Sequence, residues 1–83
     1  MYYVYVLKSE SNGKLYVGYT TNLGNRLREH YVGEVISTKS RRPLILVFYE
    51  GYKSMEDAKR RERYLKTSKG KSSLRMMLRD SLQ

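Results

Sequence analysis

Several residue types are scarce in this chain, and each scarcity excludes a class of chemistry. The 83 residues include no cysteine, no tryptophan, one proline and one histidine. Without cysteine the chain can form neither a disulfide framework, a thiolate metal site nor a thiol nucleophile, and the absence agrees with a reducing, cytoplasmic setting. The eight acidic residues are scattered along the chain, so the clustered carboxylates of a two-metal site are also missing.

Long apolar runs are missing as well. No segment approaches the roughly 20 apolar residues that are needed to cross a bilayer. The first residues, MYYVYVLKSES, have no basic lead, and their apolar run is too short for the core of a signal peptide. We therefore expect a soluble, cytoplasmic protein. A chain of 83 residues has room for one core, so a single domain over residues 1–83 is expected.

Positive charge is what the chain has in excess. Seventeen Lys and Arg residues against eight Asp and Glu residues give a formal net charge of +9 at pH 7. This balance favours a polyanionic partner, with nucleic acid first and an anionic membrane second, although a solvated basic surface is the plainer alternative. The nine tyrosines could stack on unpaired bases, but tyrosine is also a common strand residue.

The residue patterning predicts an α+β domain in the order β-β-α-β-α-α, with helices packed on three strands. Asn12-Gly13 is a hairpin signal, Thr21 or Asn22 can cap the first helix, and Gly33 ends it. Leu23, Leu27 and Tyr31 are expected to form the core stripe of that helix. The expected elements are strands at 2–8, 14–19 and 44–49 and helices from 21 or 22 to 31, 54 to 66 and 72 to 82, with a basic loop over 32–42 and a break at 68–71.

The predicted hairpin leaves two registers open. A two-residue turn places Tyr5 opposite Thr20, whereas a longer loop places Tyr5 opposite Tyr16. Both registers share a parity, so each puts Tyr5, Tyr16 and Gly18 on one face of the hairpin. Ordinary cross-strand aromatic packing explains the two tyrosines taken alone. Gly18 favours a site, because a glycine inside a strand commonly marks the close approach of a backbone or a ligand.

Arg26 and His30 stand one turn apart on the first predicted helix, so they share a face beside the leucine stripe. Arg28 and Glu29 are expected to point elsewhere. Taken singly, Arg26 is a surface cation and His30 is a residue near a helix end. Together they could form a phosphate clamp beside a proton carrier.

Glu62 occupies a position where an apolar residue is expected. Met55, Ala58 and Leu65 define a helical stripe at i, i+3 and i+10, and Glu62 stands at i+7 on it. A carboxylate on such a stripe needs a partner, a metal or a proton. A salt bridge to a neighbouring cation and metal ligation explain it equally well. Any metal would be held by one or two protein oxygens plus water and substrate, which suits Mg²⁺.

In combination, these residues resemble the GIY-YIG nuclease family. Tyr3-Val4-Tyr5 stands where the family has Gly-Ile-Tyr, with the tyrosine kept, and Tyr16-Val17-Gly18 matches Tyr-Ile-Gly with one conservative change. Arg26 and His30 follow at the family's spacing. Glu62, on a helix after the third strand, sits where the family has its metal-binding glutamate. The resemblance covers almost the whole chain and is strongest to the small stand-alone members.

The resemblance implies a three-stranded antiparallel sheet with flanking helices, and hydrolysis of phosphodiester bonds with one divalent ion, Mg²⁺ or Mn²⁺. Tyr16 would act as general base, and Tyr5 would position the attacking water or the phosphate. Arg26 would stabilise the developing charge, His30 would assist, and Glu62 would hold the metal. A phenol with a reference pKa of about 10 is a weak base, so it would need a nearby arginine and a metal.

The partner implied by the resemblance is a nucleic acid, DNA rather than RNA, and no membrane. A monomer or weak dimer is expected. Because the chain has no recognisable specificity domain, either a targeting partner protein or a structural feature of the substrate is expected to direct it. The residues expected to contact the substrate are Gly18 and the cations Arg41, Arg42, Lys59, Arg63 and Lys69.

One position departs from the family pattern. Many active members have an asparagine after the metal-binding glutamate, whereas all three asparagines of this chain precede Glu62. Ser72 or Ser73 could replace that polar contact. Two alternatives to an endonuclease therefore stay open: a non-catalytic nucleic-acid-binding module of the same fold, and a basic structural protein of a larger assembly.

Overall fold

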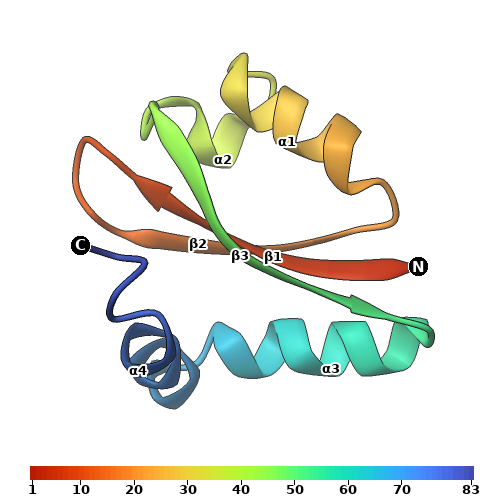
Figure 1. Ribbon diagram of the computed structural model, residues 1–83. Helices are drawn as coiled ribbons and strands as arrows, with labels where there is room; N and C mark the ends of the chain where they lie inside the picture. Colours follow the sequence, from red (N-terminus) through yellow and green to blue (C-terminus); the bar gives the residue numbers. More distant parts are fainter.

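The computed structural model describes residues 1–83 as one three-stranded sheet between two layers of helices. The strands form an antiparallel sheet in the order β2-β1-β3. Helices α1 and α2 lie on one side of this sheet, and α3 and α4 lie on the other (Figure 1). The predicted element order is confirmed, with one short helix in addition. The elements are β1 (Tyr2–Ser9), β2 (Leu15–Thr20), α1 (Leu23–Tyr31), α2 (Ile36–Lys39), β3 (Leu44–Tyr52), α3 (Met55–Leu65) and α4 (Ser68–Met77).

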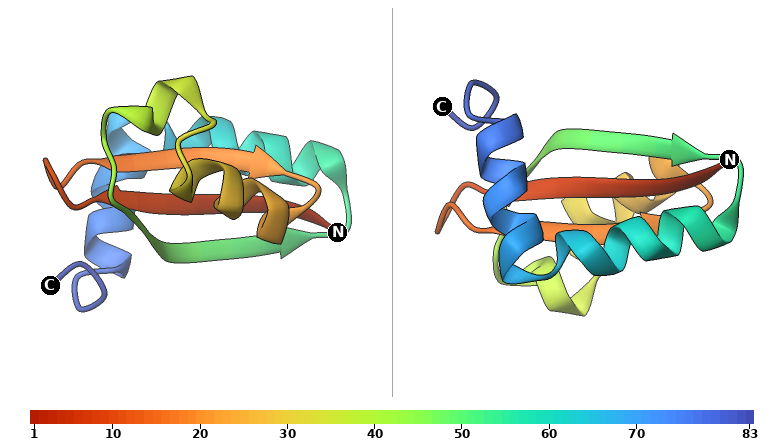
Figure 2. Two further views of the ribbon diagram at one scale, coloured as in Figure 1. Left: turned by 90° about the horizontal axis from the view of Figure 1, so that it is seen from above. Right: turned by 90° about the horizontal axis from the view of Figure 1, so that it is seen from below.

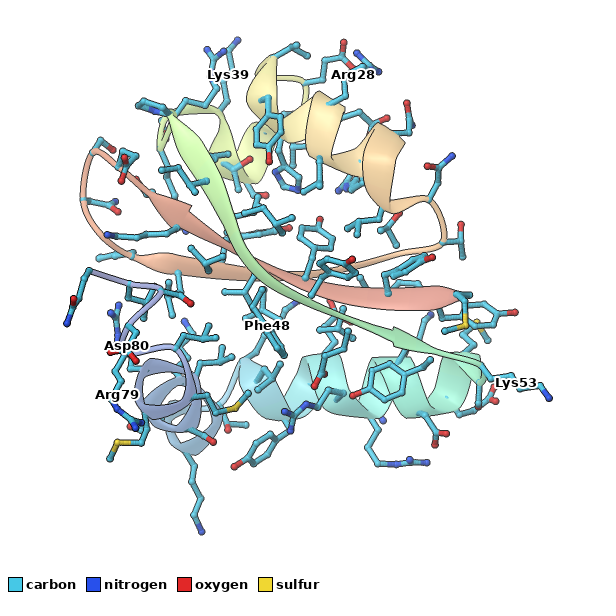
Figure 3. The ribbon with its side chains drawn as sticks, viewed as in Figure 1. Arg28, Lys39, Phe48, Lys53, Arg79 and Asp80 are labelled. Atoms are coloured by element: carbon cyan, nitrogen blue, oxygen red, sulfur yellow. The ribbon has the colours of Figure 1, made fainter.

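Alternation along the central strand β1 gives the sheet two separate cores, because successive side chains of a strand point to opposite faces. Val4 and Val6 face α3 and α4, within a cluster of eight buried residues. Tyr5 and Leu7 face α1, within a cluster of three. Figure 2 shows the two helical layers from above and from below. Phe48, labelled in Figure 3, packs against the larger cluster.

The register of the β1–β2 hairpin differs from both predicted registers. The structure pairs Tyr5 with Gly18, two residues from either predicted partner. The Ser9 N–H donates to the Lys14 carbonyl over 2.9 Å, and the Gly13 N–H donates to the Ser9 carbonyl over 2.8 Å. Only Gly13 has a positive φ here, whereas the two-residue turn needs one at both central positions. The parity is unchanged, so the two tyrosines and the glycine still share one face, as predicted.

Helix α1 begins and ends at the predicted residues. The Asn22 side chain accepts a hydrogen bond from the Asn25 N–H over 3.1 Å, which caps the first turn. After the last turn, Gly33 takes a φ of 85° and its N–H donates to the His30 carbonyl over 3.2 Å, an arrangement that favours glycine. The predicted core stripe of α1 was wrong at its last position, Tyr31. Tyr31 is 45% exposed, and His30 is buried instead.

Two further predictions of local structure were wrong. The predicted basic loop contains α2, which is held in place by the burial of Val35 and Thr38. Helix α4 begins at Ser68, inside the segment predicted as a break, and ends well before Leu82. Gly70 is buried in its first turn, where a Cβ would overlap the backbone at the end of α3. This glycine therefore permits a close helix–helix contact rather than ending a helix. None of the helices is long and apolar enough to cross a bilayer.

Candidate active site

The side chains of Tyr5, Arg26 and His30 meet on the α1 side of the sheet. The Tyr5 hydroxyl lies 2.7 Å from His30 Nε2 and accepts a hydrogen bond from Arg26 Nε over 3.4 Å. Tyr5 comes from the central strand, and the other two come from successive turns of α1. The structure thus brings together three of the side chains that the sequence predicted to be catalytic. We call these three residues the junction.

His30 is fully buried between two hydroxyl groups. Its Nδ1 lies 2.8 Å from Thr38 Oγ1, and the Thr38 hydroxyl donates to the Val35 carbonyl over 3.5 Å. We assign the Thr38 proton to this bond, so that Thr38 accepts from Nδ1–H and Nε2 accepts the proton of Tyr5. Burial, reinforced by the charge of Arg26, lowers the pKa of His30 to about 4. The imidazole is therefore neutral at pH 7.

Tyr5 is a neutral phenol in this setting. Burial raises the pKa of Tyr5 to about 12, although the hydrogen bond from Arg26 opposes the shift. Arg26 also donates through Nη1 to Glu29 Oε1 over 3.0 Å, so the prediction that Glu29 points elsewhere was wrong. Nη2 has no protein partner, and the Arg26 side chain is 36% exposed. One edge of the guanidinium is therefore open to a ligand.

Tyr16 stands beside the junction on strand β2. Its ring centroid lies 5.2 Å from that of His30 and 6.4 Å from that of Tyr5. The residue is half-buried. Its hydroxyl makes no hydrogen bond within the protein, and no buried polar side-chain atom of the protein lacks a partner, so this hydroxyl is accessible. It can therefore reach a water molecule or a substrate.

Gly18 makes room for Tyr5 in the neighbouring strand. The two residues are paired in register, and a Cβ on Gly18 would overlap the ring and hydroxyl of Tyr5. The glycine thus marks a close approach, as the sequence suggested. The approaching group is the Tyr5 ring, which could not lie over any larger residue.

Glu62 projects from α3, on the other side of the sheet from α1 (Figure 1). Its side chain is 20% exposed, and Oε2 lies 3.0 Å from Lys66 Nζ. Burial is the main cause of the raised pKa of Tyr5, and the negative charge of Glu62 adds to it. No hydrogen bond or ion pair joins Glu62 to Tyr16 or Arg26.

The donor set around Glu62 limits which metals could bind. The protein has no group of three or more His, Asp or Glu side chains that could hold an ion. One Glu62 oxygen faces Lys66, and the other has no partner in the protein. A single carboxylate completed by water and substrate oxygens fits a hard ion such as Mg²⁺ and not one that prefers nitrogen or sulfur. Ser72 and Ser73 lie on α4, and neither side chain bonds to Glu62.

Comparison with known families decides what kind of domain this is. Residues 1–75 match the model of the GIY-YIG catalytic domain. The chain belongs to the GIY-YIG family. It is 42% identical over 77 residues to a UPF0213 protein of Staphylococcus haemolyticus (strain JCSC1435), covering 92% of this chain and 93% of the relative. It is 34% identical over 82 residues to a UPF0213 protein of Pediococcus pentosaceus, covering 98% of this chain and 85% of the relative.

A solved structure agrees with this assignment. The solution NMR structure of a UPF0213 protein from Bacillus halodurans matches with a TM-score of 0.59 and 33% sequence identity, covering 93% of this chain and 85% of the other. The GIY-YIG domain therefore has a nuclease-type fold, and its relatives are small proteins of similar length. The names of these relatives state no substrate.

The remaining predicted substrate contacts of this GIY-YIG domain do not form one patch with the junction. Lys59 Nζ lies 5.2 Å from the centroid of the Tyr19 ring. Arg42 Nε donates to the Lys39 carbonyl over 3.1 Å. The five cations lie on both sides of the sheet: Arg41 and Arg42 follow α2, Lys59 and Arg63 are on α3, and Lys69 is in the first turn of α4.

Sequence reasoning missed two partners of the site. Glu29 stands at i+3 from Arg26, a spacing that favours an ion pair on a helix and could have revealed the contact. Thr38 lies on the short helix α2, which no local pattern indicates. It follows that the tautomer of His30 could not be derived from the sequence.

Proposed function

We propose that this GIY-YIG domain is a divalent-metal-dependent endonuclease that hydrolyses phosphodiester bonds in DNA. The observation that carries the proposal is the junction of Tyr5, His30 and Arg26 beside the free hydroxyl of Tyr16. The buried, neutral His30 ring holds the Tyr5 hydroxyl, and that hydroxyl in turn orients the Arg26 guanidinium. The net charge of +9 supports a polyanionic substrate.

Arg26 binds the scissile phosphate in this proposal. Its open Nη2 edge donates to a phosphate oxygen, while Tyr5 and Glu29 hold the other two nitrogens. A donor that is already oriented stabilises the charge that develops on the phosphate without reorganising during the reaction. Tyr5 is a positioning residue here, since its raised pKa keeps the proton on its hydroxyl oxygen.

Tyr16 is the proposed general base. Its oxygen has no protein partner and stands beside the junction, so in the phenolate form it can take the proton of the attacking water directly or through a second water. His30 assists by holding Tyr5 rather than by carrying a proton, because its lowered pKa keeps the ring neutral near pH 7. In-line attack then requires positioning and charge neutralisation.

Glu62 would hold one Mg²⁺ or Mn²⁺ ion, which supplies Lewis-acid neutralisation of the phosphate charge when bound. The ion pair with Lys66 does not prevent this role. Lys66 is 52% exposed, and ion pairs at such sites contribute only about 0–1 kcal/mol. The lysine can therefore release the carboxylate at little cost.

The proposal extends to the surroundings of the site. Residues 1–83 act as a single domain, as a monomer or weak dimer, on DNA ahead of RNA. A partner protein or a structural feature of the substrate supplies targeting. Contacts to the substrate outside the site include those of Arg41, Arg42, Lys59, Arg63 and Lys69.

Nicking of supercoiled plasmid by the purified protein in Mg²⁺ tests the proposal. Tyr16→Phe removes one hydroxyl group and is expected to slow cutting by about 10²- to 10⁴-fold, because general-base catalysis is lost. Glu62→Gln is expected to reduce cutting in Mg²⁺ comparably. The matched controls are Tyr31→Phe and Glu56→Gln, both exposed and outside the site, and both should cut at the parent rate.

Three outcomes would contradict the proposal. Equal cutting by the parent and by the Tyr16→Phe/Glu62→Gln double variant would assign the activity to a contaminating nuclease. Binding of DNA without cutting, across Mg²⁺, Mn²⁺ and several substrates, would exclude the enzyme. A binding constant that does not change with salt would exclude an electrostatic nucleic-acid site altogether.

The second candidate function is a non-catalytic nucleic-acid-binding module. It is favoured by the absence of any asparagine after Glu62 and by the lack of a bond from Ser72 or Ser73 to that carboxylate. In this case Glu62→Gln would leave DNA binding unchanged, and Arg26→Gln would weaken it. The same plasmid and binding assays therefore separate the two functions.

A further inference from the structure

Four cations from three parts of the chain surround a cavity of about 320 Å³. Lys14 directly precedes β2, Arg41 lies between α2 and β3, and Lys71 and Arg75 project from α4. Leu15 forms the apolar part of the wall. The hairpin turn, the start of β3 and α4 all lie at one end of the molecule, at the left of Figure 1. We call this the basic cavity; it shares no residue with the junction.

No carboxylate neutralises the basic cavity. The five ion pairs of the protein involve Arg26, Arg28, Arg60, Arg61 and Lys66, and none involves a cavity cation. Like charges that are gathered without counter-charges repel one another and destabilise the compact state. A bound anion would relieve this repulsion, so the cavity is suited to an anionic ligand.

Hydrogen bonds fix the three walls of the basic cavity relative to one another. Arg75 Nη2 donates to the Gly13 carbonyl over 3.3 Å, which links α4 to the hairpin turn. The Ser9 hydroxyl donates to the Arg41 carbonyl over 2.7 Å, which links the end of β1 to the loop before β3. The cations are thus gathered before a ligand arrives. A ligand that binds there avoids part of the ordering cost of assembling its site.

Strand β2 connects the basic cavity to the candidate active site, although α4 and α1 lie on opposite sides of the sheet (Figure 1). The Ser9 N–H donates to the Lys14 carbonyl, so the hairpin ladder continues past Leu15 to Lys14. Lys14 and Tyr16 are therefore two residues apart along one extended segment, and the strand rise puts their Cα atoms about 7 Å apart. Phosphates of one strand follow at about 3.4 Å along a duplex axis, so a nucleic-acid strand that runs along β2 from Tyr16 would reach Lys14 within a few nucleotides.

We propose that the basic cavity binds a backbone phosphate of the nucleic acid, a few nucleotides from the phosphate at Arg26 and Tyr16. The choice of polyanion rests on the proposed function, whereas the phosphate contact does not require cleavage. By holding a flanking phosphate, the cavity sets which phosphate of the strand reaches Tyr16. Free inorganic phosphate offers the same chemistry and is the competing source of the ligand.

A pair of double variants tests the basic cavity. Lys14→Gln/Lys71→Gln removes two exposed lysines whose side chains make no hydrogen bond or ion pair, so the fold is not disturbed. Lys39→Gln/Lys53→Gln is the matched control. It removes the same charge from two exposed lysines that lie away from α4 (Figure 3).

Binding of a labelled DNA oligonucleotide, without added metal, is measured for both double variants over about 50–200 mM salt. Loss of one phosphate contact should weaken binding by about five- to tenfold and reduce the salt slope by about 1 in the cavity variant. The control should change much less. An equal loss in both variants would overturn the proposal, because net charge alone would then explain it.

Amide signals of Lys14, Lys71 and Arg75, followed by NMR, distinguish the two sources of phosphate. The oligonucleotide is expected to shift them. If inorganic phosphate saturates them while the cavity variant binds the oligonucleotide as tightly as the parent, the backbone-phosphate proposal is overturned. A domain that binds through the cavity but never cuts supports this proposal and contradicts only the nuclease. If the domain cuts DNA and the cavity variant binds DNA as tightly as the parent, the nuclease proposal is supported and the cavity proposal is contradicted.

Discussion

At the scale of single residues, His30 determines what its neighbours can do. It is the only histidine of the chain, and it is fully buried between the hydroxyls of Tyr5 and Thr38. A neutral ring accepts from one hydroxyl and donates to the other. An imidazolium would have to donate to both from a buried position, which is unfavourable. The ring is therefore a fixed hydrogen-bonding spacer rather than a surface proton carrier.

The pH dependence of stability should report this burial. The folded-state pKa of about 4 lies below the reference value of 6.5, so between these values the unfolded chain binds more protons. Stability that is fully present above about pH 6.5 is therefore lost as the pH falls toward 4. From pH 7 to pH 5 the free energy of unfolding should drop by about 2 kcal/mol. Urea unfolding at the two pH values measures the drop.

The control for this prediction is His30→Gln, which cannot titrate. Its free energy of unfolding should be lower at pH 7 but should change little between pH 7 and pH 5. An equal drop in the parent and the variant would assign the pH dependence to the carboxylates. NMR titration of the ring protons gives the pKa of His30 directly.

At the scale of secondary-structure elements, two helical glycines have opposite roles. Gly70 is buried where α4 meets the end of α3, and a Cβ there would overlap the Tyr64 carbonyl and the Leu65 backbone. Gly24 is exposed in the first turn of α1, and a Cβ there would meet nothing within 4 Å. The same residue type therefore marks a helix contact in one place and only weakens a helix in the other.

Alanine at these two positions should shift stability in opposite directions. Gly70→Ala forces α3 and α4 apart and should lower the free energy of unfolding by about 1–3 kcal/mol. Gly24→Ala should raise it by about 0.4–1 kcal/mol, through helix propensity and a less flexible unfolded chain. Thermal unfolding monitored by circular dichroism measures both. Unchanged stability in Gly70→Ala would show that α3 and α4 do not approach each other closely at Gly70.

At the scale of the whole molecule, the two faces of the sheet differ in how much they bury. The α3/α4 face has eight buried core residues and the α1 face has three. The junction lies on the thinner face. Segments with few buried apolar contacts open at lower free energies than the rest of a protein. The site therefore stands on the part of the fold that opens more easily.

Native-state hydrogen exchange should show this difference. The amides of α1 are expected to exchange through openings that cost at least about 1–2 kcal/mol less than those of α3, because less apolar surface is exposed when α1 detaches. The Leu27 and Leu65 amides are suitable reporters, one in each helix. Equal protection of both amides, at the global free energy of unfolding, would contradict the prediction.

The sequence by itself determined what depends on short spacings along the chain. Strand alternation, the Asn22 cap and the Gly33 stop act within a few residues, so strands β1 and β2 and helix α1 were predicted with nearly correct bounds. The parity that places Tyr5 and Gly18 on one face holds in every register considered. The pairing of Arg26 with His30 on one helix face is of the same kind, since it follows from the helical period.

Only the tertiary structure decided the contacts between residues far apart in the chain. Whether Tyr5 packs over Gly18 depends on a two-residue difference in register that the turn alone does not signal. Thr38 is the buried residue of the short helix α2 and reaches His30 from there, and Gly70 continues a helix because α3 lies against it. Burial and close packing arise only when distant segments meet, so these features cannot be derived from local patterns.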